Sequence, residues 1–435
     1  MKYTDDIQAA SNDPERLEQL YQASRQANEE AEFRTDLQEF IDKTPDNLLL
    51  SAWHSRFTHH PMPKTRRTTH WGLAAAFGVI TGLILWAISD FQFLFLDKIP
   101  YFFILWAPIA SIPAIIFLTV ISKNNYRYAV ISCISLIVAP LYVLLITPGM
   151  SELASRDYLT LMIITLPLLC WIGIGVSVLG FKSSDANRFA FLIKSIETVI
   201  TAGIYLIFGI ALGMITLGMF SALNVTLPDS IIRLFAMGGF GLIPIMAVAT
   251  IYDPQVSPEA QDFTQGLSKF IFTLVRLLLP LTILVLVIYI FVIPFNFMAP
   301  FQNRELLIVY NVMQFAIIGL LIGATPLKVD DLSTKLQTWL RRGIIAVSVL
   351  ALVISIYALS AVIYRTSLDE FTLNRTTIIG WNMINIIILS ALIFSQSGKN
   401  LTGWHERLQR VFSKATTAYL VWSIFLIVFL PLIFR

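Results

Sequence analysis

Eleven long apolar runs dominate this sequence and restrict the folds open to the chain. A helix needs about 20 apolar residues to cross the hydrocarbon core of a bilayer. The runs are continuous, whereas the strands of a membrane barrel would alternate apolar and polar residues. We therefore predict an all-α, polytopic transmembrane helix bundle. The predicted spans lie at roughly 71–89, 101–121, 128–147, 157–179, 198–223, 231–250, 267–294, 305–325, 343–363, 376–395 and 416–434.

The polar residues are unevenly distributed. Of the 435 residues, 56% are hydrophobic and only 14% are charged, compared with about 25% charged residues in soluble domains. Residues 1–70 nevertheless contain 9 Lys and Arg and 12 Asp and Glu. This contrast predicts a soluble helical head at 1–65 and a transmembrane bundle at 66–435.

The head carries signals for two or three helices. Asp13 stands at an N-cap position, and Pro14 follows at the first helical position, which is a favoured arrangement. The stretch "EEAEFRTDLQEFIDKTPDN" resembles the second helix of a tetratricopeptide repeat. One such unit is too short to bury a core by stacking. The head therefore either packs on the membrane body or offers a docking surface to a protein partner or a second copy.

The distribution of basic residues predicts the orientation in the membrane. With the head inside, the cytoplasmic segments contain 18 Lys and Arg and the opposite segments contain seven. Cytoplasmic loops carry the excess of Lys and Arg. We therefore expect a multi-pass protein of the bacterial cytoplasmic (inner) membrane, with the N-terminus cytoplasmic and the C-terminus extracytoplasmic.

Ionisable residues within spans are costly, so each one is a candidate substrate-binding residue. Arg276 lies about ten residues into the seventh run, and Lys194 and Glu197 are spaced to pair on one helix. That helix extends from about Arg188 to Leu223, or about 54 Å at 1.5 Å per residue. We expect its first three turns to project beyond the bilayer core and to place the pair at the interface. In the alternative, Glu197 reaches the core and is available for proton coupling.

The loop "YRTSLDEFTLNR" lies on the predicted outer side, where basic residues are disfavoured. Asp369 and Glu370 stand between Arg365 and Arg375, at a spacing that allows ion pairs. We interpret these residues, with Asn374, as a structural clamp on the ends of two spans. Direct ligand contact by the two arginines and a plain solvated loop remain alternatives.

The same stretch resembles a known family. It is similar to the closing motif of an uncharacterised bacterial polytopic membrane-protein family, domain of unknown function family four thousand one hundred fifty-three. In that family, an arginine at the end of one span is followed by Thr-x-Asn-Arg and then another span. Arg365, Thr372, Asn374 and Arg375 match this pattern, and the resemblance covers roughly 185–395. It implies a bacterial membrane location and supplies no activity.

Two basic segments are expected to contact anionic lipid headgroups. Residues 51–70 contain four basic residues and no acidic one. Residues 396–415 place apolar and basic residues on opposite helix faces, which predicts an amphipathic helix lying in the interface.

The catalytic motifs H-E-x-x-H and G-x-S-x-G and the phosphate-binding P-loop are absent from the sequence. We therefore expect no enzyme activity, metal, cofactor or nucleic-acid partner. Amide side chains recur within the spans at Asn311, Gln314, Asn382 and Asn385, and such groups mostly hold helices together.

Two hypotheses for function follow. In the first, the bundle binds or translocates a small solute or lipid. In the second, the protein is a non-catalytic membrane scaffold or sensor whose head recruits a protein partner.

Overall fold

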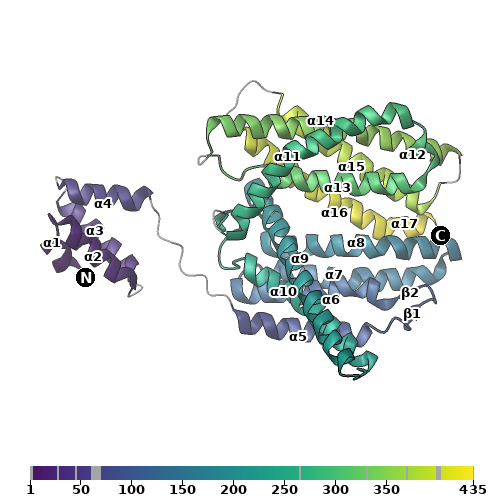
Figure 1. Ribbon diagram of the computed structural model, residues 1–435, viewed down its shortest axis with the longest axis horizontal. Coiled ribbons are helices and arrows are strands. Elements are labelled where there is room, and N and C mark those ends of the chain that lie inside the picture. Colours follow the sequence, from purple (N-terminus) through teal and green to yellow (C-terminus); the bar gives the residue numbers. More distant parts are fainter. Residues whose placement is uncertain are drawn as a thin grey trace. The chain divides into compact units, whose positions relative to one another are not determined.

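The computed structural model (Figure 1) describes residues 3–26, 29–44, 47–59, 70–263, 266–329, 332–368, 371–397 and 403–434. The chain divides into two compact units, Met1–Thr68 and Thr69–Arg435.

The first unit is a bundle of four short helices: α1 (Thr4–Ala9), α2 (Pro14–Gln26), α3 (Glu30–Lys43) and α4 (Leu48–His59). Asp13 Oδ1 accepts hydrogen bonds of 3.1 Å from the backbone N–H groups of Glu15 and Arg16, so it caps α2 as predicted. The sequence signals missed α1, a helix of only six residues. The unit has its own core, made of Ile7, Ala10, Leu17, Tyr21, Phe33, Leu37, Leu50 and Trp53.

Within its described residues, the second unit contains eleven helices long and apolar enough to cross a membrane, and it confirms the predicted all-α polytopic bundle. These helices begin up to five residues before the predicted runs, except three that begin at Asp185, Thr334 and Trp404 and so start 9–13 residues earlier than predicted. They are α5 (Trp71–Ile88), α6 (Tyr101–Ser122), α7 (Tyr126–Ile146), α8 (Glu152–Leu179), α9 (Asp185–Ala222), α10 (Asp229–Ile251), α11 (Gly266–Val292), α13 (Arg304–Ala324), α14 (Thr334–Leu368), α15 (Leu373–Ser395) and α16 (Trp404–Ile424).

Short elements connect or extend the long helices. The last span continues through a π-helical turn, η4 (Phe425–Phe429), into α17 (Leu430–Ile433). The other short elements are the antiparallel strands β1 (Leu94–Phe95) and β2 (Ile99–Pro100), the 3₁₀ turns η1 (Thr147–Gly149), η2 (Pro258–Ala260) and η3 (Ile293–Asn296), and α12 (Ala299–Gln302).

The long helices form two packed groups. One group contains α5 to α8 and α10, and the closest approach within it lies between α5 and α10. There a Cβ atom on Gly241 would lie 2.3 Å from the backbone nitrogen of Gly82, so the contact requires glycine. The other group contains α11, α13, α14, α15 and α16, together with the first turns of α9.

Helix α9 is more buried at its start than the sequence alone indicates. Phe189, Leu192 and Ile193 in its first turns pack in the core of the second group, and the expectation that these turns lie beyond the bilayer core stays a prediction. The far half of the helix is the exposed part, as at Phe208 and Leu212, and Figure 1 shows this half reaching beyond neighbouring helices. The first turns can be buried because they carry an apolar face, and because Lys194 and Glu197 pair with each other.

The C-terminal basic segment also differs from the prediction. Residues 404–415 do not form a separate interfacial helix, because they are the first turns of α16, which continues to Ile433 as one span. Trp404, Leu408 and Phe412 are buried in the core of the second group. The apolar face that the sequence assigned to lipid is therefore covered by neighbouring helices.

Candidate functional site

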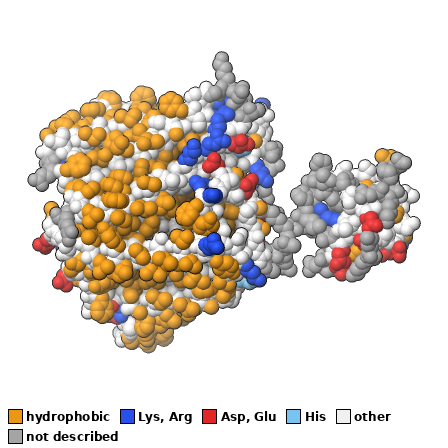
Figure 2. Space-filling view, turned by 180° about the vertical axis from the view of Figure 1, so that it is seen from behind, with side chains coloured by type: hydrophobic (Ala, Val, Ile, Leu, Met, Phe, Trp, Pro, Cys, Tyr) orange, Lys and Arg blue, Asp and Glu red, His pale blue; other side chains and the backbone are white. Residues whose placement is uncertain are grey.

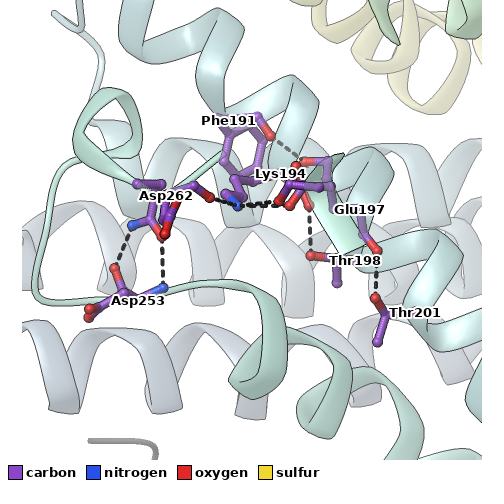
Figure 3. Close-up of polar contacts among 10 residues, drawn as sticks. Phe191, Lys194, Glu197, Thr198, Thr201, Asp253 and Asp262 are labelled. Atoms are coloured by element: carbon purple, nitrogen blue, oxygen red, sulfur yellow. Dashed lines mark hydrogen bonds and ion pairs between the residues drawn. The ribbon is translucent and has the colours of Figure 1, made fainter. Parts of the chain in front are cut away.

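The most buried charges of the membrane unit are Lys194 and Glu197, one turn apart on α9 (Figure 3). Lys194 Nζ donates to Glu197 Oε2 at 2.7 Å and to the carbonyl oxygen of Asp262 at 2.7 Å. It also lies 3.4 Å from Ser268 Oγ and 4.4 Å from the centre of the Phe263 ring. The ammonium group is thus surrounded by acceptors from three segments of the chain.

Burial makes this pair energetically demanding. The side chains of Lys194 and Glu197 are only 5% and 1% exposed. Glu197 Oε1 is also buried and accepts no hydrogen bond within the described part of the chain. A buried ion pair is stable only where good geometry and further hydrogen bonds offset desolvation. The lysine meets this condition, whereas the glutamate has one oxygen without a partner.

The contacts of Lys194 connect α9 to the segment between α10 and α11. This segment has its own internal support, because Gln261 Nε2 donates to the carbonyl oxygen of Asp253 at 2.7 Å and Gln261 Oε1 accepts from the Asp253 N–H at 3.0 Å. The predicted pairing of Lys194 with Glu197 is confirmed. No sequence pattern predicts the contacts of Lys194 with Asp262 and Ser268, which lie 68 and 74 residues away.

Arg276 lies within the span α11, as predicted. Its guanidinium carbon is 5.9 Å from the centre of the Phe272 ring, and its Nε atom is buried with no hydrogen-bond partner in the described part of the chain. No carboxylate within the described residues pairs with it. A role in substrate binding stays a prediction for Arg276, as it does for Lys194 and Glu197.

The predicted outer clamp can be assessed only in part, because Asp369 and Glu370 lie outside the described residues. Arg365 lies in the last turn of α14, and its Nη1 atom is buried without a hydrogen-bond partner among the residues that the structure describes. Asn374 and Arg375 lie in the first turn of α15, where Thr372 Oγ1 accepts from the Arg375 N–H at 3.4 Å. The structure thus places both arginines at helix ends and leaves the clamp itself a prediction.

A seam of polar side chains joins α13, α15 and α16. Asn382 Nδ2 donates to Asn311 Oδ1 at 2.9 Å, and Asn385 Nδ2 donates to Gln314 Oε1 at 3.1 Å. Tyr419 donates its hydroxyl proton to Asn385 Oδ1 at 2.8 Å. The prediction that these amides hold helices together is confirmed. Tyr419 was not predicted, because a tyrosine in an apolar run gives no sign of its partner.

A lateral groove runs between α15 and α16. It consists of two adjoining hollows of about 470 and 520 Å³, which share Ile384, Lys414 and Ala418. Basic side chains lie where α16 begins, and the remainder of the groove is mainly apolar. The apolar lining includes Ile387, Ile388, Ala391, Val411, Ala415 and Val421. Figure 2 shows one broad apolar face of this unit, with Lys and Arg side chains gathered toward one end.

A third apolar hollow, of about 390 Å³, lies on the other side of the last span. Its walls come from α7, α8, α16 and η4, and they include Leu136, Leu169 and Leu420. Helix α16 therefore has apolar hollows on both sides. Sequence reasoning missed the groove, because the apolar residues of its two walls read as ordinary span residues.

Comparison with protein-family models, with curated proteins and with solved structures found no match. The resemblance over 185–395 therefore stays a prediction.

Proposed function

We propose that this protein binds a membrane lipid in the lateral groove between α15 and α16. Its eleven apolar helices identify it as an integral membrane protein. The observation that supports lipid binding is the groove, an apolar concavity between two spanning helices. Ligand sites of about 300–1,000 Å³ with mainly apolar walls are typical of proteins, and each hollow of the groove lies within this range.

The groove suits an acyl chain better than a small polar solute. Ile384, Ile388 and Ala418 offer no hydrogen bond from their side chains, so a polar solute in the middle of the groove would lose its contacts with water. An acyl chain has no hydrogen bonds to lose in the groove, and it makes dispersion contacts with the walls. The groove therefore supports binding of a lipid better than binding of a small solute.

The proposal has a location and an orientation. We place the protein in the bacterial cytoplasmic membrane with the head inside, because the excess of basic residues lies on the head side of the spans. The role proposed is binding without catalysis.

The test fills the groove with a large side chain. Native mass spectrometry would compare the purified full-length wild type, Ala418→Trp in the groove, and Ala211→Trp as a matched control on the exposed half of α9. We expect a lipid to stay on the wild type and on Ala211→Trp and to be lost from Ala418→Trp. A wild type that retains no lipid, or an equal signal from Ala418→Trp, would refute the proposal.

A second candidate function is the recruitment of a protein partner by the head. The observation that favours it is a separate hydrophobic core in residues 1–68, combined with Leu48, which is 87% exposed. Crosslinking of the full-length chain in its own membrane, compared with Leu48→Asp, tests this candidate. A crosslinked polypeptide that disappears in the variant would support it, and identical crosslinks in both chains would count against it.

A further inference from the structure

We infer that the groove selects an anionic phospholipid, whose headgroup is held by Arg410 and Lys414 where α16 begins. This inference rests on the proposed lipid site and adds the chemical class of the ligand. Three basic residues line the groove, and its described lining contains no acidic residue.

Lys414 lies deep enough along the last span to be within the hydrocarbon core. The last span contains 30 residues, from Trp404 to Ile433, which is about 45 Å of helix. A hydrocarbon core of about 30 Å centred on it leaves only about 7 Å beyond the core at each end. Lys414 lies about 15 Å along the helix from Trp404, so its backbone is inside the core.

Lys414 is also exposed at this depth. A charge at membrane depth is costly and is normally paired with another group or extended toward the interface. No hydrogen bond or ion pair within the described residues engages its ammonium group. The side chain lines the groove and, by extending toward the start of α16, it brings the ammonium group close to the boundary between the core and the headgroup region.

Arg410 can also bind a headgroup, because its ion pair leaves much of the side chain exposed. Its Nε atom is 3.5 Å from Asp185 Oδ2, and the two side chains remain 59% and 45% exposed. Asp185 is shared, since its Oδ1 accepts from Ser413 Oγ at 2.8 Å. A guanidinium engaged on its Nε side still presents donors to a phosphate, and arginine binds phosphate in a two-pronged geometry.

Arg407 connects two helices of the bundle. Its Nε donates to the carbonyl oxygen of Ser395 at 2.9 Å and so ties the start of α16 to the end of α15. Arg410 and Lys414 together face one carboxylate within the described residues, Asp185, in their ion pairs. The excess of positive charge favours a headgroup with net negative charge over a zwitterionic one, whose own ammonium group would be repelled.

The experiment titrates the purified full-length protein with phosphatidylglycerol and with phosphatidylcholine of the same acyl chains, with native mass spectrometry as the readout. The variants are Arg410→Gln/Lys414→Gln and Lys414→Gln alone. The control, Arg342→Gln, removes an exposed charge on α14 at the same end of the bundle, where the adjacent Arg341 donates to Gln396. We expect the wild type and the control to prefer phosphatidylglycerol by roughly tenfold, given the attraction of anionic headgroups to each basic residue.

The double variant should retain lipid and lose most of this preference, and Lys414→Gln should lose part of it. Equal binding of both lipids by the wild type, with loss of both in Ala418→Trp, would overturn the inference and leave the proposed lipid site standing. A wild type that retains neither lipid would overturn both. If the double variant does not fold, an unchanged preference in Lys414→Gln would be sufficient to reject the inference.

Discussion

Two charged clusters of the membrane unit have opposite surroundings. Around Lys194 the chain provides a carboxylate, a carbonyl oxygen and a hydroxyl within 3.4 Å, and the lysine side chain is 5% exposed. Around Arg410 and Lys414 the described residues provide only one shared carboxylate, and both side chains are exposed. Within the described residues, the Lys194 ammonium has a counter-ion and further acceptors, whereas Arg410 and Lys414 share a single carboxylate and together carry more positive charge than it offsets.

This difference separates a structural role from a binding role. A buried charge with internal partners stabilises one arrangement of helices, and removing either partner leaves the other uncompensated. An exposed charge on a spanning helix contributes little to packing and is instead available to a lipid or solute. The comparison predicts effects on stability at the first cluster and effects on lipid binding at the second.

The largest expected effect is at the buried pair. Glu197→Leu leaves the Lys194 ammonium buried without its counter-ion, and we expect it to lower the free energy of unfolding by about 3–5 kcal/mol. Thermal unfolding of the full-length protein in detergent measures this loss. The double variant Lys194→Met/Glu197→Leu should regain most of the stability, because it leaves no unpaired charge. A double variant as unstable as Glu197→Leu would show that the pair is not the cause.

The polar seam should show the next largest effect. Asn385→Leu removes the hydrogen bonds to Gln314 and Tyr419, and hydrogen bonds between spanning helices contribute about 0.6 kcal/mol on average and up to about 1.7 kcal/mol. We expect a destabilisation of about 1–2 kcal/mol, smaller than at Glu197 because a neutral amide costs less to leave unpaired. A double-mutant cycle with Gln314→Leu checks the coupling. Strictly additive losses would contradict the link seen between α13 and α15.

Local spacing predicted the parts of the fold and site that depend on neighbouring residues. The spans are visible because each is a continuous apolar run. Lys194 and Glu197 are visible as a pair because they lie three residues apart on one helix, and the amides of Asn382 and Asn385 are visible because they stand within an apolar run. Partners from distant segments, such as Asp262 and Tyr419, have no periodicity that indicates them.

The wrong prediction for the start of α16 has a physical cause. The pattern of α16, with apolar residues on one face and basic residues on the other, is the same whether the apolar face contacts lipid or other helices. Packing decided the outcome, because Phe412 of α16 stacks on Phe189 of α9 with the ring centres 6.0 Å apart.

A surface ion pair in the head gives a smaller effect and a useful contrast with the buried pair. Arg56 Nη1 lies 2.5 Å from Glu18 Oε2 with both side chains more than a third exposed, and the guanidinium lies 4.4 Å from the centre of the Trp53 ring. Arg56→Ala should cost about 0.5–1 kcal/mol of head stability. Hydrogen exchange of the α2 and α4 amides in the full-length chain measures it. High salt should reduce this loss by screening the exposed pair, and it should leave the effect of Glu197→Leu unchanged. The same salt dependence in both variants would contradict the distinction between an exposed and a buried ion pair.

The smallest effect on intrinsic stability is expected at the groove. In detergent without added lipid, Arg410→Gln/Lys414→Gln should change the free energy of unfolding by no more than about 0.5 kcal/mol, as is usual for surface substitutions. Added phosphatidylglycerol should then raise the melting temperature of the wild type, because a ligand that binds only the folded state stabilises it. The double variant should show little of this rise, whereas Glu197→Leu should show it in full from its lower starting temperature. A large loss in the double variant without lipid would mean that the basic residues of α16 support the fold, as Lys194 does, and the contrast between the two clusters would fail.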